Sequence, residues 1–209
     1  MTGGSAGGTA HGAVPEAVVD ESWPTTPASV ATRGTIWFTG LSGAGKTTVA
    51  TTLKVMLDAL AVRTFLLDGD VLRSGLNSDL TFSDDDRAEN VRRIGEVALL
   101  FAGVGHLSLV TVISPYDAGR TAVRARHAAV GVPFLEVYVA TPLEVCEQRD
   151  PKGLYARARR GEVTRFTGIS APYEVPKDAE LEIFTTDRTP VQSATEVFEL
   201  LVERGLITG

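Results

Sequence analysis

The sequence contains a phosphate-binding pattern at residues 40–47, which read Gly-Leu-Ser-Gly-Ala-Gly-Lys-Thr. In such a loop the glycines let backbone N–H groups converge on phosphate oxygens, the lysine adds a positive charge and the threonine hydroxyl can bind Mg²⁺. An apolar run precedes the pattern and an amphipathic run follows it, which is the context that the motif requires. We therefore predict a nucleoside triphosphate site built from Gly40, Leu41, Ser42, Gly43, Ala44, Gly45, Lys46, Thr47 and Thr48.

Two carboxylates follow the next apolar run, in the segment Leu67-Asp68-Gly69-Asp70. If that run is a parallel strand, both lie at the same sheet edge as the phosphate loop. Acidic groups there can hold Mg²⁺ and accept a proton from an attacking hydroxyl, as phosphoryl transfer requires. Asp-Gly-Asp is also good turn chemistry, but its position favours a catalytic role. We predict Lys46, Asp68 and Asp70 as catalytic residues, and Thr47 and Asp68 as metal ligands.

Other classes of nucleotide-binding protein fit less well. The sequence holds no Asn-Lys-x-Asp segment for guanine recognition, which disfavours a GTPase. With 209 residues, the chain is also short for an oligomeric motor. A kinase that transfers the γ-phosphoryl group of a nucleotide to a small acceptor remains.

The scaffold for these residues is indicated by short apolar runs that alternate with longer amphipathic ones. The short runs are mostly apolar on both faces, as parallel strands buried between helices should be. Their order predicts an α/β fold with a central parallel sheet and helices on both faces. We expect strands at residues 35–39, 64–67, 107–113, 134–139 and 181–184, and helices at residues 46–60, 86–102, 118–130, 142–149 and 190–204.

Composition narrows the class further. The net charge of −6 disfavours a nucleic-acid surface, which usually needs a basic face, and no apolar run of about 18 residues offers a membrane span. The single cysteine, Cys146, cannot form an internal disulfide, and the N-terminus lacks a basic start before an apolar block, so we expect a cytoplasmic protein. Residues 1–33, rich in Gly, Ala, Ser, Thr and Pro and containing Trp23, are expected to form a flexible tail before one domain at residues 34–209.

Several longer strings carry more information than their spacing alone. They are Asp-Gly-Asp, an arginine and Gly-Leu-Asn-x-Asp-Leu within residues 68–80, Asp-Arg-Ala-Glu-Asn-Val-Arg-Arg at 86–93, Ile-Ser-Pro-Tyr at 113–116, TPLEVCEQRDPKGLY at 141–155 and Phe-Thr-Gly-Ile at 166–169. Together they resemble the adenylylsulfate kinase (APS kinase) family over nearly all of residues 34–209. The resemblance implies a P-loop kinase fold, Mg²⁺ dependence, a homodimer, and the reaction of ATP with adenylylsulfate (APS) to give ADP and 3′-phosphoadenylylsulfate (PAPS).

The resemblance also implies roles on the acceptor side. Arg73, Arg87 and Asn90 would hold the phosphosulfate and the ribose of APS. Phe82 and Phe166 would sandwich its adenine. The planar donor fork of arginine suits phosphate and sulfate oxygens better than a lysine does, which agrees with these roles.

Further roles follow from the same resemblance. Ile113 and Ser114 would line the acceptor pocket, and we count Ser114 among the catalytic residues. Asp68 would help to place Mg²⁺ and the ribose 3′-hydroxyl. Arg149 would lie against the ATP adenine, and Lys152 would join the ATP-binding residues. Any coupling to ATP sulfurylase, the preceding enzyme, would involve a separate chain.

The predicted helix at residues 86–102 and the segment after the fourth helix have distinct charge patterns. On the helix, Arg87, Asn90 and Ile94 share one face, whereas for Arg92 and Arg93 we favour a solvated or ion-paired face.

Residues 149–165 contain six basic residues against two acidic ones. We interpret this segment as a basic lid that closes over the triphosphate and excludes water. A merely exposed basic helix is the alternative.

Four positions depart from the family pattern. Asp117 and Gly119 stand where the family usually has Arg and Asp, Thr164 replaces a lysine, and Ser170 replaces an aspartate. These positions lie close to the expected acceptor site, so two alternatives stay open. One is a paralogous P-loop kinase that acts on another nucleotide or a specialised metabolite. The other is a nucleotide-binding regulatory protein with little catalysis, which the retention of both halves of the site disfavours.

Overall fold

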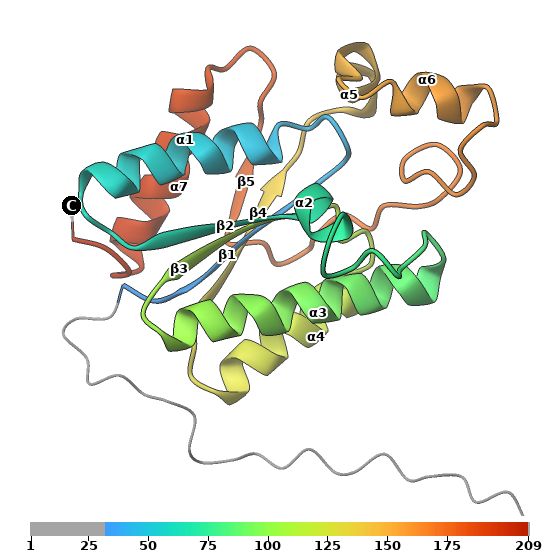
Figure 1. The fold of residues 1–209 in the computed structure, drawn as a ribbon. Helices are drawn as coiled ribbons and strands as arrows, with labels where there is room; N and C mark the ends of the chain where they lie inside the picture. Colours follow the sequence, from blue (N-terminus) through green and yellow to red (C-terminus); the bar gives the residue numbers. More distant parts are fainter. Residues whose placement is uncertain (1–31, 209) are drawn as a thin grey trace, which may run out of the picture.

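The computed structural model describes residues 32–208. Its strands are β1 (Gly34–Thr39), β2 (Thr64–Asp68), β3 (Leu107–Thr111), β4 (Phe134–Val139) and β5 (Leu181–Ile183). They form one parallel five-stranded sheet in the order β2-β3-β1-β4-β5 (Figure 1). In the register of the sheet, Thr35 lies opposite Ser108 on one side and opposite Phe134 on the other. The five predicted strands and their parallel arrangement are confirmed.

Helices cover both faces of the sheet. The larger ones are α1 (Lys46–Ala59), α3 (Asp84–Gly103), α4 (Asp117–Ala129) and α7 (Pro190–Glu203). α1 and α7 pack together on one face, and α3 and α4 pack together on the other (Figure 1). Side chains of the central strand alternate accordingly, because Ile36 and Phe38 join the core beneath α1 and α7 whereas Trp37 joins the core beneath α3 and α4. The three-layer α/β prediction is confirmed.

Some elements begin or end elsewhere than predicted. β3 stops at Thr111, where its ladder with β1 and β2 ends, although the apolar sequence continues. α3 begins at Asp84 because the Ser83 hydroxyl caps it by accepting a hydrogen bond from the Asp86 N–H at 3.2 Å. The remaining predicted elements agree with the structure to within one residue at each end. The short helices α2 (Gly69–Arg73) and α6 (Leu154–Arg159) were not predicted, while α5 (Leu143–Arg149) was.

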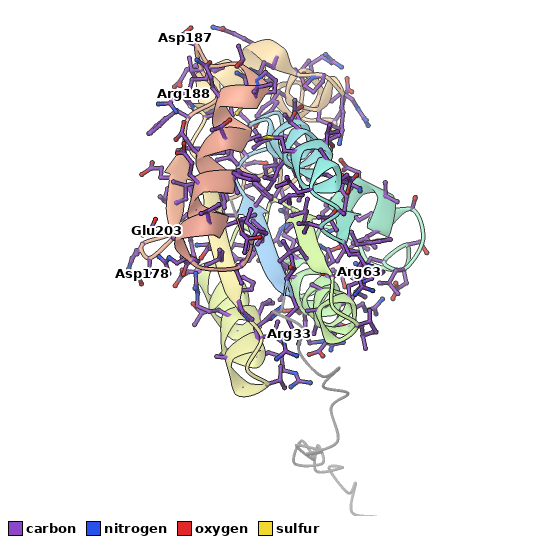
Figure 2. The ribbon with its side chains drawn as sticks, turned by 90° about the vertical axis from the view of Figure 1, so that its left-hand side faces the viewer. Arg33, Arg63, Asp178, Asp187, Arg188 and Glu203 are labelled. Atoms are coloured by element: carbon purple, nitrogen blue, oxygen red, sulfur yellow. The ribbon has the colours of Figure 1, made fainter. Side chains whose placement is uncertain are left out.

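The carboxyl ends of the strands lead into the segments that carry the predicted site. The phosphate loop follows β1, α2 follows β2, and the fourth strand leads into α5 and the lid (Figure 1). Arg33 and Arg63, by contrast, directly precede β1 and β2 and lie at the amino-terminal end of the sheet (Figure 2). These two arginines are therefore not part of the phosphate-binding region.

Two predictions concern regions or properties beyond the sheet. The expected tail, including Trp23, lies outside the described residues except for residues 32 and 33. Within residues 32–208, no helix combines the length and apolar character that a membrane span needs.

Candidate active site

The phosphate loop takes its shape from glycine. Gly40 and Gly45 have φ angles of 145° and 101°, which residues with a Cβ rarely adopt. A Cβ on Gly40 would also lie 2.6 Å from the carbonyl oxygen of Val139. Gly45 is the N-cap of α1, so the N–H groups of the first helical turn are available to phosphate oxygens. The loop therefore has the backbone form that the sequence pattern predicts.

Lys46, the first residue of α1, folds back over this loop. The residue is 9% exposed, and its ammonium group donates to the carbonyl oxygens of Gly40 at 2.9 Å and Leu41 at 2.7 Å. Burial lowers the pKa of Lys46 to about 8. The charge of Lys46 therefore lies in the loop, within reach of a phosphate bound there.

Asp68, the last residue of β2, lies beside Thr47 of the phosphate loop. Its Oδ2 accepts hydrogen bonds from the hydroxyls of Thr47 at 2.8 Å and Thr111 at 3.0 Å. Its Oδ1 caps α2 by accepting from the Asp70 N–H at 2.9 Å. Partial burial alone would raise the pKa of Asp68, but these hydrogen bonds outweigh burial and hold the pKa below its ordinary value. Asp68 is therefore ionised at neutral pH.

The side chains of Thr47 and Asp68 form an oxygen donor set that fits Mg²⁺. In kinases this ion is usually held by one or two carboxylates together with water and substrate phosphates. Among residues 32–208, no three His, Cys, Asp or Glu side chains gather to hold a metal by themselves. Asp70 does not join this pair, because its carboxylate forms an ion pair with Lys152. The donor set therefore suits an ion that is shared with a nucleotide.

Arg87 connects the start of α3 to the lid. It is 7% exposed, and its Nε donates to the carbonyl oxygen of Phe82 at 2.9 Å. Its Nη1 donates to Thr167 Oγ1 at 2.6 Å, and its Nη2 donates to the carbonyl oxygen of Arg165. A guanidinium carries five N–H groups, so further donors remain for an anionic ligand. Arg87 and Asn90 both lie on the buried face of α3 that the sequence predicted.

The two predicted stacking rings have different surroundings. Phe82 is 57% exposed, and the guanidinium carbon of Arg73 lies 4.5 Å from its ring centre, with that of Arg87 at 5.8 Å. Phe166 is 8% exposed and packs edge-on against Tyr155, with ring centroids 4.9 Å apart. The structure thus brings Phe82 together with both arginines but places Phe166 in the core. Their pairing around an adenine stays a prediction.

Asn90 and Ser114 are held by buried polar neighbours. Asn90 Oδ1 accepts a hydrogen bond from Asn77 Nδ2 at 3.1 Å. Ser114 is 3% exposed, and its hydroxyl accepts from Trp37 Nε1 at 3.0 Å and donates to Thr39 Oγ1 at 2.9 Å. The Ser114 hydroxyl therefore fixes the loop after β3, and its catalytic role stays a prediction.

A cavity of about 470 Å³ lies beside this loop. One wall is formed by Asp84, which accepts a hydrogen bond from the Tyr116 hydroxyl at 2.5 Å and forms an ion pair with Arg165. Ala171 and Pro172 also line the cavity. Ile113, which precedes Ser114, is half-buried but is not among the lining residues.

The four departures from the family pattern occupy different environments. Ser170 lines the cavity, and its hydroxyl accepts from the Phe166 N–H at 2.9 Å. Asp117 is exposed and pairs with Arg120 at 3.2 Å, Gly119 faces α3, and Thr164 is exposed. Only Ser170 among the four therefore borders this cavity.

The lid uses its basic residues in two ways. Arg157 and Arg160 pair with Glu162, and Arg159 pairs with Glu147, all on the exposed surface. Lys152 instead reaches Asp70 on α2. Part of the positive charge of the lid is therefore neutralised by neighbouring carboxylates.

The predicted ion-paired face of α3 is also present, because Arg92 and Arg93 both pair with Glu89.

Two threonines that we did not predict form hydrogen bonds to the backbone of the phosphate loop. The carbonyl oxygen of Ala44 accepts hydrogen bonds from Thr141 Oγ1 at 2.9 Å and Thr185 Oγ1 at 2.8 Å. Arg149 donates from Nη1 to Thr185 Oγ1 and from Nη2 to the Thr185 carbonyl oxygen, each at 2.8 Å. A signal for Thr185 existed in the sequence, because it directly follows the fifth predicted strand, where ligands of parallel sheets gather.

The parallel α/β sheet carries a phosphate loop shaped by glycines, with the hydroxyl of Thr47 and the carboxylate of Asp68 beside it and a basic lid nearby. This combination is typical of P-loop kinases that phosphorylate small molecules. The family model described as "Adenylylsulphate kinase" matches residues 32–184. The chain belongs to the adenylylsulfate kinase family.

Individual relatives agree with this assignment. The adenylyl-sulfate kinase of Saccharomyces cerevisiae is 49% identical over 173 residues, which cover 83% of this chain and 86% of the yeast protein. The bifunctional enzyme CysN/CysC of Mycobacterium tuberculosis (strain ATCC 25618 / H37Rv) is 53% identical over 167 residues, which are 80% of this chain but 27% of that enzyme. This chain therefore spans about a quarter of the bifunctional relative. The structure of the M. tuberculosis APS kinase CysC in complex with AMPPNP and APS is 52% identical, with a TM-score of 0.79, and the match covers 81% of this chain and 98% of that chain.

Proposed function

We propose that this protein transfers the γ-phosphoryl group of ATP to the ribose 3′-hydroxyl of APS and releases ADP and PAPS. The proposal depends on one observation: Lys46, Asp68 and the acceptor-side residue Arg87 lie in the segments at the carboxyl ends of the strands, in a chain of this family. The M. tuberculosis relative whose structure contains AMPPNP and APS supports both the nucleotide and the acceptor.

The donor half of the site would bind ATP through the phosphate loop. Backbone N–H groups and Lys46 would hold its phosphates, and Arg149, anchored to Thr185, would lie against its adenine. Thr47 and Asp68 would hold Mg²⁺, and this ion would neutralise negative charge on the phosphates. In phosphoryl transfer, positioning and electrostatic stabilisation supply most of the catalysis, so the phosphate loop would contribute a large part of it.

The acceptor half would align a hydroxyl with the γ-phosphate. Asp68, ionised at neutral pH, would accept a hydrogen bond from the 3′-hydroxyl and orient it. Arg73 and Arg87 would bind the phosphosulfate, with Asn90 on the ribose. Phe82, exposed beside both arginines, would stack on the adenine.

The remaining predicted residues would act around these two halves. Asp70 and Lys152 join α2 to the lid, and would let lid closure respond to nucleotide phosphates. Ser114 would shape the floor of the acceptor pocket. Phe166 would pack beneath the acceptor pocket. We also propose that its ring contacts the adenine of APS. We further propose a cytoplasmic homodimer that receives APS from an ATP sulfurylase. The M. tuberculosis relative, which is named a bifunctional enzyme, supports a functional link to a second activity.

The proposal is tested by ADP release from Mg-ATP in the presence of APS, with AMP as a control for the missing sulfate. We expect APS to accelerate ADP release, AMP not to do so, and mass spectrometry to detect PAPS. Lys46→Ala should lower the APS-dependent rate about a thousandfold, whereas Lys54→Ala, further along the same helix and paired with Asp58, should not. No acceleration by APS in the wild type would refute the proposal.

A kinase with a different acceptor remains a second candidate because Ser170 borders the cavity. ADP release with another nucleotide or metabolite, but not with APS, would favour it. Tight ATP binding with no turnover on any acceptor would instead favour a regulatory protein.

A further inference from the structure

Two segments that are distant in the sequence meet beside the cavity described above. The acceptor loop, residues 113–116, follows β3 and contributes Tyr116 to the cavity wall. The strap, residues 170–175, contributes Ser170 and the two residues after it. The N–H of Glu174 donates to the carbonyl oxygen of Pro115 at 2.8 Å, so the strap and the acceptor loop contact each other directly.

Arg120 of α4 lies at the junction of these two segments and is 1% exposed. Its Nη1 donates to the carbonyl oxygen of Ser114 in the acceptor loop at 2.8 Å. Its Nη2 donates to the carbonyl oxygen of Glu174 in the strap at 2.9 Å. Its Nε forms an ion pair with Glu136 on β4 at 2.7 Å, and Nη2 also reaches Asp117 at 3.2 Å. One planar side chain therefore joins the acceptor loop, the strap and the sheet.

The acceptor loop has a conformation that needs such support. Ser114 has a φ of 41°, in the left-handed region that non-glycine residues rarely adopt. Residues keep such conformations only when their surroundings determine them. The Ser114 hydroxyl is bound by Trp37 and Thr39, and its carbonyl by Arg120. Thr39 also lies 2.9 Å from the Tyr173 hydroxyl, so the same network includes the strap.

The chemistry of this junction requires arginine. Glu136 is 6% exposed and, on its other oxygen, pairs with Arg124 at 3.3 Å, so the buried positive charge of Arg120 has a buried acidic partner. Lysine has its donors on a single atom and cannot reach acceptors that are spread around a planar fork. An apolar residue at position 120 would leave the carbonyl oxygen of Ser114 without this partner, which is costly in the interior.

The donor site is built from other contacts. The phosphate loop is held by Thr141, Thr185 and Arg149, and none of these is a partner of Arg120 among the hydrogen bonds of the described residues. A change at Arg120 should therefore reach the acceptor side first.

We propose that Arg120 is a positioning residue that sets the affinity for the phosphoryl acceptor by fixing the acceptor loop against the strap. Arg120 does not touch the reacting groups. The identity of the acceptor as APS rests on the proposed function, whereas the positioning role rests on the contacts of Arg120.

The positioning role is tested without any substrate by hydrogen exchange followed by mass spectrometry. We compare Arg120→Met and Arg120→Lys with Arg124→Met, a matched variant one helical turn away that also loses a partner of Glu136 but contacts neither the acceptor loop nor the strap. In both Arg120 variants we expect faster exchange in residues 113–116 and 170–175, with residues 40–47 unchanged. Arg124→Met should leave all three segments as in the wild type. Unchanged exchange in the acceptor loop and strap of a folded Arg120 variant would overturn the proposal.

Steady-state kinetics test the consequence for the acceptor. In Arg120→Lys we expect the KM for APS to rise about tenfold, as the loss of positioning hydrogen bonds predicts. The KM for ATP should change little, and Arg124→Met should keep both values. An equal rise in the two KM values would overturn the proposal. If Arg120→Met does not fold, Arg120→Lys keeps the charge beside Glu136 and provides both measurements. Absence of APS-dependent turnover in the wild type would count against the proposed function alone, since hydrogen exchange still decides the role of Arg120.

Discussion

His127 should make the stability of this protein sensitive to mild acid. It is fully buried on α4, and its Nδ1 donates to the carbonyl oxygen of Val123 at 2.8 Å, which leaves Nε2 to accept from Thr35 Oγ1 at 2.8 Å. Burial lowers the pKa of His127 to about 4. The nearby charges of Glu96 and Arg126 pair with each other at 3.2 Å and do not compensate for burial. The folded protein therefore holds His127 in its neutral form.

The sign and size of the effect follow from linkage. Because the folded pKa is lower than that of an unfolded histidine, the unfolded chain binds more protons between about pH 6.5 and pH 4, and stability is lost as the pH falls through this range. With pKa values of about 6.5 and about 4, His127 should reduce the free energy of unfolding by about 1.8 kcal/mol between pH 7 and pH 5. Carboxyl groups also begin to titrate at the acid end of this window, so the contribution of His127 is the difference between the losses of the wild type and of a variant without this histidine.

Urea unfolding at pH 7 and pH 5 measures this loss directly. In His127→Gln the loss should be much smaller, because glutamine can donate to Val123 and accept from Thr35 without titrating. His106→Gln, at a half-buried position, is the matched control and should show the wild-type loss. If the wild type and His127→Gln lose the same free energy between the two pH values, the assignment of this effect to His127 is refuted.

Three further substitutions test the site and the helix packing. Lys46→Ala should lower kcat by about a thousandfold through lost phosphate stabilisation while the melting temperature stays near that of the wild type; near-normal turnover would contradict the role of Lys46. Arg87→Ala should raise the KM for APS while the KM for ATP is largely kept, and an equal rise in both would argue against placing Arg87 on the acceptor side. In Gly95→Ala, the new Cβ would lie 2.8 and 2.9 Å from the methyl carbons of Val123, so urea unfolding should show a loss of about 1–3 kcal/mol. Gly75→Ala, where a new Cβ meets nothing within 4 Å, should show no such loss, and similar losses in both would exclude a clash with α4 as the cause.

The sheet could be predicted because its signal is hydrophobic and local. β1, β3 and β4 are mostly apolar runs buried along almost their whole length, and the alternation with amphipathic runs implies parallel pairing. The short helices could not be predicted in the same way. α2 has five residues and α6 has six, too few for a helical period to repeat. The end of β3 was also missed, because the apolar sequence continues after the hydrogen-bonded ladder has stopped at Thr111.

The donor side of the site could be predicted more completely than the acceptor side. The phosphate loop is contiguous in the sequence, so its pattern already contains its geometry. The acceptor side depends on contacts such as Arg87 with Thr167 and Arg120 with Glu174, which join positions 80 and 54 residues apart. No local pattern encodes such pairs, and the burial of Phe166 depends likewise on the packing of Tyr155 against it.

The distribution of hydrogen-bond acceptors bears on how an acidic chain would bind the two polyanions of the proposed reaction. The net charge is −6, and the arginines on the outer surface of the lid already pair with carboxylates. Lys46 and Arg87 differ, because their donors are bound largely to neutral acceptors, mainly backbone carbonyl oxygens. A phosphate or sulfate oxygen carries charge and accepts a stronger hydrogen bond than a carbonyl oxygen does, so exchanging the carbonyl for the anion is favourable. Exchanging a carboxylate for the anion would bring no such gain. The affinity for anions should therefore depend on the few cations with neutral partners, and removing lid surface arginines such as Arg159 should change it much less than removing Lys46 or Arg87.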